Sequence, residues 1–271
     1  MLGPFDAACA PRRGRRGAHA ACVALAILLT SLLFFSVHAS AARADWPQQA
    51  ELTAAGSTFL GTAVAVDGDT AVVGAGLDGA HPGPVDVFVR AGTSWSLQAQ
   101  LNPSDLASQF GNAVAISGNT ALVGAPGLNN VGGAAFVFVR SGSTWSQQAE
   151  LVSPYPPPPP SGAADFGQTV AIDGDTAVVG APAGGRSGAG AAEVFARSGS
   201  TWSHQATLSG SGTAGSFGES VGVSGTTAVV GVRGVVGAPI GSVSVFTRSG
   251  SAWSQEAVLT SSDGVSSDGF G

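Results

Sequence analysis

Four copies of one pattern follow each other along most of this chain. The copy that spans residues 110–151 reads FGNAVAISGNTALVGAPGLNNVGGAAFVFVRSGSTWSQQAEL, and the others span residues 60–101, 166–208 and 217–259. A lone tail, residues 46–52, precedes the first copy, and a lone head, Phe270-Gly271, ends the chain. The second residue of each head is Gly, and these glycines are 50, 56, 51 and 53 residues apart. A near-fixed period of this size is typical of propellers and solenoids.

Each copy predicts four short strands from its alternation and its β-branched residues. In the second copy they cover residues 113–117, 120–124, 134–140 and 145–151, and Gly118-Asn119 forms a two-residue turn. The third strand is apolar on both faces at Val137-Phe138, as in a sheet that is covered on both sides. The sequence therefore predicts an all-β fold of four-stranded antiparallel propeller blades over residues 45–271, with four complete blades, an N-terminal orphan strand and the start of a fifth.

Residues 1–44 do not fit the repeat. Arg12, Arg13, Arg15 and Arg16 precede an apolar run, residues 20–37, and the segment ends with Ala42-Arg43-Ala44. This order predicts a secretory signal peptide that is cleaved after Ala44, and hence a secreted, extracellular or cell-surface protein. A transmembrane anchor is the alternative, although the run is short for one, and export by the Sec or the twin-arginine route stays open. Both cysteines, Cys9 and Cys22, lie in this segment, so the mature chain has none.

Charge argues against two classes of partner. All basic residues are Arg, and residues 45–271 hold six of them against sixteen Asp and Glu, a net charge of −10. An acidic body without a basic patch is a poor match for nucleic acid. It is equally unsuited to anionic membrane surfaces. We therefore expect neither as a partner of the mature protein.

An Arg closes every third strand, and a Trp opens the fourth strand five residues later. In the second copy they are Arg140 and Trp145. Across a short hairpin the two side chains should be cross-strand neighbours, and we expect the guanidinium to stack on the indole. Because the pair recurs in all four copies, we interpret it as structural. The other pairs are Arg90 with Trp95, Arg197 with Trp202, and Arg248 with Trp253.

The repeat resembles the FG-GAP repeat family, the type found in the propeller of integrin α-subunits and in many bacterial secreted proteins. Phe110-Gly111 with Gly124-Ala125-Pro126 carries the resemblance, as do Phe166-Gly167 with Gly180-Ala181-Pro182, and Phe217-Gly218. The first copy departs at Leu60-Gly61 and Gly74-Ala75-Gly76, and the fourth has Gly231-Val232-Arg233. The family implies a ring closed by the chain ends, where the orphan strand 46–52 would complete a last blade. We expect either a fragment of a larger propeller, which we favour, or an open array.

The family resemblance also raises the question of calcium binding, because integrin-type repeats can carry an Asp-rich loop between their first two strands. Here the loop has shrunk to Asp67-Gly68-Asp69 and Asp173-Gly174-Asp175, with Ser117-Gly118-Asn119 and Ser224-Gly225-Thr226 in the other copies. Two carboxylates on one turn do not supply the six to eight oxygens that calcium needs. We therefore expect plain hairpin turns and no metal site.

Other chemically suggestive residues also have a plain explanation. Residues 218–222, GESVG, match a hydrolase nucleophile elbow around Ser220, but such an elbow needs a helix after the serine, and the register makes this an ordinary repeat position. His81 and His204 are expected to be isolated, solvated side chains. Six prolines among residues 154–160 favour a stiff exposed insertion, with recognition by an aromatic groove as the alternative.

These expectations combine into a non-enzymatic scaffold. We expect a secreted or cell-surface β-propeller that binds a protein or glycan through the loops between its strands, with no catalytic residues, cofactor or metal site. Two alternatives remain open. One is a propeller that serves as an accessory domain of a larger extracellular enzyme, and the other is a calcium-dependent, integrin-like adhesion module.

Overall fold

The structure is a computed structural model that describes residues 48–54, 60–75, 83–104, 109–127, 132–155, 165–184, 189–210, 216–233, 241–262, 264 and 270–271. The chain divides between Gln48 and Gln49, and the Gln49–Gly271 unit contains every strand. The predicted signal peptide, residues 1–44, and the cleavage point after Ala44 lie outside the described residues. In the described part all regular elements are strands, and no helix there is long and apolar enough to cross a bilayer.

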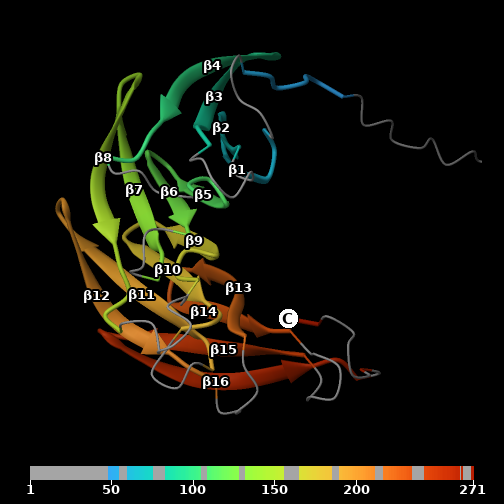
Figure 1. Cartoon of the computed structure of the whole chain (residues 1–271), viewed down its shortest axis with the longest axis vertical. Helices are drawn as coiled ribbons and strands as arrows, with labels where there is room; N and C mark the ends of the chain where they lie inside the picture. Colours follow the sequence, from blue (N-terminus) through green and yellow to red (C-terminus); the bar gives the residue numbers. More distant parts are fainter. Residues whose placement is uncertain are drawn as a thin grey trace, which may run out of the picture. The chain divides into compact units, whose positions relative to one another are not determined.

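Each copy of the repeat forms one antiparallel sheet whose four strands pair in chain order (Figure 1). We call these sheets blades one to four. Blade one holds β1 (Ala63–Asp67), β2 (Thr70–Gly74), β3 (Val85–Ala91) and β4 (Ser94–Leu101). Blade two holds β5 (Ala113–Ser117), β6 (Thr120–Ala125), β7 (Ala134–Ser141) and β8 (Thr144–Leu151). The prediction of four-stranded, all-β blades is confirmed, with strand ends in blade two moved by one residue at most. The predicted orphan strand, residues 46–52, is wrong for the described residues 48–52, which have no strand partner there and form no strand.

The other two blades repeat this arrangement. Blade three holds β9 (Thr169–Asp173), β10 (Thr176–Ala181), β11 (Ala191–Ser198) and β12 (Thr201–Leu208). Blade four holds β13 (Phe217–Ser224), β14 (Thr227–Val232), β15 (Ser242–Ser249) and β16 (Ala252–Thr260). The first strands of successive blades lie next to one another, β1 beside β5, β5 beside β9 and β9 beside β13.

The middle strands of a blade are buried on both faces. In blade two every residue of β6 is buried, as are the first five residues of β7, whereas β8 is exposed or half-buried up to its last residue, the buried Leu151. All regular elements of the described residues are strands, so it is neighbouring sheets that cover the two faces. The predicted two-sided burial of the third strand is therefore confirmed, and it makes blade-on-blade packing the source of the core.

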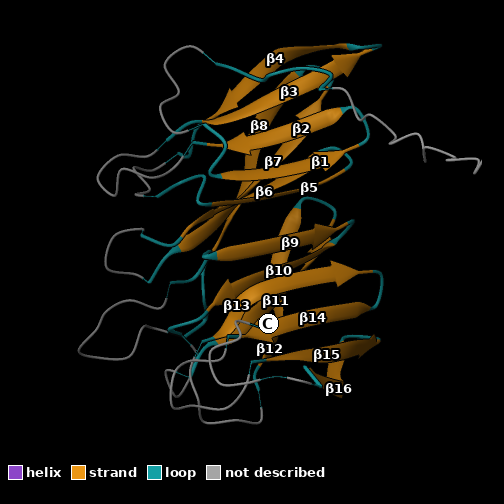
Figure 2. Ribbon diagram, turned by 90° about the vertical axis from the view of Figure 1, so that its right-hand side faces the viewer, coloured by secondary structure: helices purple, strands orange, loops and turns teal. Residues whose placement is uncertain are grey.

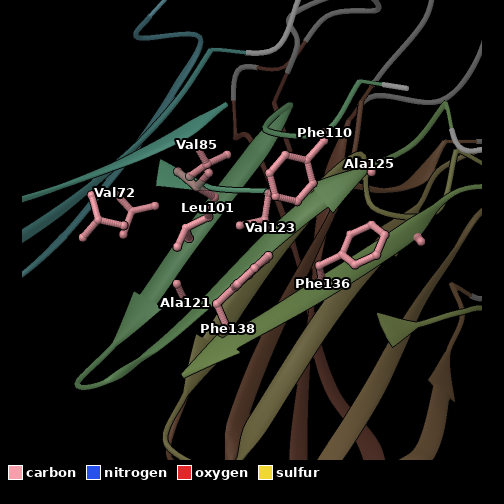
Figure 3. Close-up of a cluster of buried hydrophobic side chains, with 12 residues drawn as sticks. Val72, Val85, Leu101, Phe110, Ala121, Val123, Ala125, Phe136 and Phe138 are labelled. Atoms are coloured by element: carbon pink, nitrogen blue, oxygen red, sulfur yellow. The ribbon is translucent and has the colours of Figure 1, made fainter. Parts of the chain in front are cut away.

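The core lies between the blades. Between blades one and two, Val72, Val85 and Leu101 of the first blade pack against the aromatic rings of the second (Figure 3). The ring of Phe110 meets those of Phe136 and Phe138 edge-to-face, at centroid distances of 5.7 and 6.0 Å. This geometry adds to the free energy gained from burying the rings.

Two glycines bring neighbouring blades into backbone contact. A Cβ built on Gly124, at the end of β6, would lie 2.0 Å from the carbonyl oxygen of Gly167 in the next blade. Gly167 itself has φ +94°, and it donates its N–H to the oxygen of Gly180 in its own blade at 3.0 Å. No other residue fits such an approach. The equivalent contacts are Gly74 with Gly111, Gly180 with Gly218, and Gly231 with Gly271.

These contacts show why the packing tolerates the departures from the family pattern. The fourth copy has Val232-Arg233 after its glycine, yet Gly231 still lies against Gly271 as the others lie against their partners. In the first copy Gly61 donates to the oxygen of Gly74 at 2.9 Å, although Leu60 replaces the phenylalanine before it. The two glycines of each copy, such as Gly111 and Gly124, are thus the part of the motif that the packing requires. They are thirteen residues apart in every copy.

The two ends of each blade differ in their connections. Two-residue turns join β1 to β2 and β3 to β4 at one end, which we call the turn end. All connections from second to third strands, and from each blade to the next, leave from the other end, which we call the loop end. Figure 2 shows the strands running between these two ends. The fold thus separates the nearly constant connections from the variable ones.

Candidate functional site

The Arg–Trp pairs form at the turn end of all four blades. Arg140 and Trp145 are direct cross-strand partners on β7 and β8, and the guanidinium carbon lies 5.3 Å from the centre of the indole. The distances in blades one, three and four are 5.6, 5.3 and 5.6 Å. Both side chains lie on the same face, so the predicted stacking is confirmed. Such a contact contributes on the order of 0.5–1 kcal/mol at an exposed site.

The same Arg also ties the turn of its own blade to the preceding blade. The Nε of Arg197 donates to Oδ1 of Asp175 at 2.7 Å, and its Nη1 donates to Oγ1 of Thr120, in blade two, at 3.0 Å. Arg140 makes equivalent bonds to Asn119 and to Thr70 of blade one, at 2.9 Å each. The guanidinium fork suits this task because its donors point in several fixed directions.

A β-bulge in every fourth strand turns one side chain toward the next blade. On β8 the register shifts so that Val137 pairs with Ala149 and Phe138 with Gln147, which leaves Gln148 as the bulged residue. Oε1 of Gln148 accepts the indole N–H of Trp202, in blade three, at 2.9 Å. Bulges often serve to redirect a side chain. The same bond joins Trp95 to Gln49, Trp145 to Gln98 and Trp253 to Gln205.

The turn carboxylates that were considered as calcium ligands are hydrogen-bonded to other groups of the protein. Asp69 binds Arg90 of its own blade, with 2.7 Å between its Oδ1 and the Nε. Oδ2 of Asp67 accepts the backbone N–H of Gly118, in the turn of blade two, at 2.5 Å. Asp173 binds the N–H of Gly225 in the same way at 2.6 Å. The plain hairpin turn that the sequence predicts is present, and the first carboxylate of each turn, Asp67 or Asp173, connects its blade to the next.

Ser220 has a structural role at its repeat position. It lies within β13, and its Oγ donates to the carbonyl oxygen of Gly271 at 2.7 Å. Thr169, the equivalent residue of blade three, donates to the oxygen of Gly218 at 2.8 Å. A nucleophile elbow stands at a strand-to-helix turn, whereas a two-residue turn and another strand follow Ser220. The interpretation of GESVG as a repeat position is confirmed.

His204 is exposed, as predicted, but the prediction that it is isolated is wrong. Its Nε2 lies 2.7 Å from Oε2 of Glu193, a carboxylate that is fully buried. Oγ1 of Thr207 donates to the same oxygen at 2.5 Å. Residues three apart on a strand normally point to opposite faces, but the bulge at Gln205 places His204 and Thr207 on one face, around Glu193. A periodicity argument that assumes a regular strand misses this cluster.

The cluster does not have the geometry of a catalytic triad. A triad places the carboxylate and the hydroxyl on different nitrogens of the imidazole ring. Here Oε2 of Glu193 and Oγ1 of Thr207 both approach Nε2 of His204, at 2.7 and 3.4 Å. The ring also packs edge-to-face on Phe195, with 5.5 Å between centroids. The arrangement gives Oε2 of the buried Glu193 two partners, while its Oε1 has no hydrogen-bond partner among the described residues.

The remaining predicted positions lie largely outside the described residues. His81 and Pro156–Pro160 are among these, and of the proline-rich insertion the structure describes only Pro154 and Tyr155. Across the described ranges, no three His, Cys, Asp or Glu side chains gather closely enough to hold a metal ion. The polar contacts that the structure does show serve mainly to join the blades.

Comparison with protein families agrees with this architecture. The model of the FG-GAP repeat matches residues 46–88, 95–138 and 145–195, about half of the chain. Each match starts at a Trp that opens a fourth strand or its N-terminal equivalent, and ends at the Phe of the next third strand. A comparison with curated proteins found no match. With its repeated glycine pairs and four-stranded, propeller-like blades, this chain belongs to the FG-GAP repeat family.

Proposed function

We propose that the protein is a secreted or cell-surface, non-enzymatic scaffold that binds a protein or glycan through its loop end. The main support is the difference between the two ends of the blades. The turn end carries two-residue turns in all four blades, whereas the connections at the loop end differ in length and sequence from blade to blade. A constant frame that carries variable connections at one end is the usual arrangement of a recognition scaffold.

The uses of the polar side chains also support a role other than catalysis. Asp69, Asp175, Arg197 and Ser220 bind protein groups in the same pattern from blade to blade. Catalytic groups instead converge on one place where a substrate can sit. Because these residues have the same structural role in each blade, they are poor candidates for a site specific to one ligand. The loops, which differ between blades, are better candidates.

Exchange of loops between blades tests the proposal. The full-length chain is first screened against arrays of extracellular proteins and glycans. Residues 185–188 of blade three are then replaced by residues 128–131 of blade two, which occupy the equivalent connection. We expect binding of the ligand found to fall at least about tenfold while the melting temperature changes little.

A substitution at the turn end provides the matched control. Ser143→Ala changes an exposed residue between β7 and β8 and should leave binding unchanged. Loss of binding in this variant, with full binding after the loop exchange, would contradict the proposal. So would steady hydrolytic turnover by the chain on the ligand that it captures.

Calcium offers a separate check on the type of scaffold. The two carboxylates of the blade-one turn already hold Arg90 and the N–H of Gly118. A cation there would have to displace both partners, so we expect the same melting temperature with calcium and with chelator. A rise of several degrees on adding calcium would instead support the calcium-dependent adhesion module.

A further inference from the structure

A fully buried carboxylate lies in the interface between blades two and three. Glu193 pairs with Val179 across β11 and β10, so the two side chains share one face of the sheet. Val179 belongs to the apolar cluster that joins these blades, together with Leu122 and Val137 of blade two. Glu193 therefore points toward blade two, and its side chain is 0% exposed. A negative charge in such surroundings is costly unless a positive charge lies close to it.

The contacts of this carboxylate are unequal. Oε2 has two partners, Nε2 of His204 at 2.7 Å and Oγ1 of Thr207 at 2.5 Å. Oε1 has no hydrogen-bond partner in the described part of the chain. Of the two partners of Oε2, the imidazole ring can carry a positive charge, and it does so only when both of its nitrogens hold a proton.

The neighbouring charged groups are engaged elsewhere or lie on another face. Arg197 is four residues further along the same face of β11, and Asp175 binds its Nε at 2.7 Å. Glu150 of β8 pairs with Phe136, on the face of blade two that packs against blade one. Asp165, at the head of blade three, forms no ion pair among the described residues. The blade-two side chains that cover the face of the buried carboxylate are apolar: Leu122, Ala135, Val137 and Leu151.

Comparison of the four copies shows that this pair is not part of the common pattern. Blade three alone combines an acid with a histidine at these two repeat positions. The other combinations are Asp86 with Leu97, Phe136 with Gln147, and Ser244 with Gln255. The structural role that the repeat shares from blade to blade therefore does not account for the histidine.

We propose that Glu193 and His204 form a pH-sensitive contact between blades two and three, which is strongest while the imidazole is protonated. A positive ring 2.7 Å from the carboxylate forms a charge-assisted hydrogen bond where little water is present to weaken it. When the ring loses its proton, Nε2 can still donate a hydrogen bond, but the buried negative charge loses its compensation. The side chain of His204 is 29% exposed, so protons exchange with solvent without unfolding.

The direction of the pH dependence follows from proton uptake. The charged ring is favoured in the folded chain, where the carboxylate is beside it, and not in the unfolded chain. Folding therefore takes up protons at this site, and proton uptake makes stability fall as the pH rises. The contribution should be present at about pH 5.5, above the ordinary range of carboxyl groups and below that of imidazole, and absent at about pH 8.5.

Thermal melts of the full-length chain at these two pH values test the proposal. His204→Gln keeps a hydrogen-bond donor but cannot carry a charge, and Gln is the residue that blades two and four have at this position. We expect the substitution to lower the melting temperature by at least about 3 °C at the lower pH and by less than about 1 °C at the higher pH.

Two further variants separate the charge pair from other effects of pH. In a chain that carries Glu193→Gln, His204→Gln should shift the melting temperature equally at both pH values, because the carboxylate is gone. Gln255→His places a histidine at the equivalent position of blade four, where Ser244 replaces the acid, and should add no stability at the lower pH. An effect of His204→Gln that is equal at the two pH values or larger at the higher one would overturn the proposal. So would a pH difference that persists in the Glu193→Gln chain.

Discussion

Equivalent side chains have different surroundings at the interface between blades three and four and on the outer face of blade four, the face that points away from blade three. Leu208 and Val178 form part of a closed core in the first, whereas Leu259 and Val229 face solvent in the second. In the described structure, the contribution of such a residue to stability therefore depends on whether a neighbouring blade is present. Paired substitutions at equivalent positions can measure that difference directly.

The largest difference is expected at the glycine contacts. A Cβ on Gly124 would lie 2.0 Å from the backbone oxygen of Gly167, inside the stack of blades. Because both partners are held on all sides, Gly124→Ala should lower the free energy of unfolding by about 4 kcal/mol or more. Gly118→Ala, in an exposed turn of the same blade, adds a Cβ that meets nothing within 4 Å and strains only its own φ of +56°, so its cost should be about 1–2 kcal/mol. Equilibrium urea unfolding measures both; equal costs would contradict the comparison.

Truncation of the two leucines comes next. Leu208→Ala removes a side chain that is 2% exposed and leaves a cavity, so unfolding should become easier by about 3 kcal/mol. Leu259→Ala should cost under about 1 kcal/mol because solvent already reaches that side chain. Thermal melts of both variants provide the test. A similar shift in the two melts would show that the outer face of blade four is covered in solution.

The Arg residues should show a smaller difference. Arg197→Lys keeps the charge but loses the fork that binds Asp175 and Thr120 together, which should cost about 1–2 kcal/mol. The contacts of Arg90 in the described part of the chain are with Asp69 and Trp95 of its own blade, so Arg90→Lys should cost about half as much. Urea unfolding at low and high salt distinguishes the two, since the exposed Asp69 pair is screened more strongly.

The smallest difference is expected at the bulge. Gln148→Ala leaves the indole N–H of Trp202 without its acceptor in a partly buried site, at a cost of about 1 kcal/mol. Glu256→Ala, at the equivalent position of blade four, should change stability by less than about 0.5 kcal/mol. The near-ultraviolet circular dichroism of the tryptophans reports the first change independently. An unchanged tryptophan signal in Gln148→Ala would show that the hydrogen bond between Gln148 and Trp202 does not form in solution.

Much of the fold could be predicted because a repeat supplies four views of one unit. The strands, the Arg140–Trp145 stacking and the structural reading of Ser220 all followed from aligned positions. The bulge could not be predicted, since the strand on either side of Gln148 keeps an ordinary pattern. Without the bulge, the bond from Gln148 to the next blade and the cluster around Glu193 remain hidden. Both depend on one extra residue in the register.

The glycine pairs also decide where this chain can change its length. The two glycines of a copy are thirteen residues apart in every copy, while the whole repeat varies between 50 and 56 residues. One residue added between Gly111 and Gly124 would shift β5 against β6 and turn each side chain of one strand to the opposite face. An addition after Leu151, where the proline-rich stretch already stands, changes neither the spacing of Gly111 and Gly124 nor that of Gly167 and Gly180. New sequence, natural or engineered, can therefore enter at the loop end without loss of the contacts between blades.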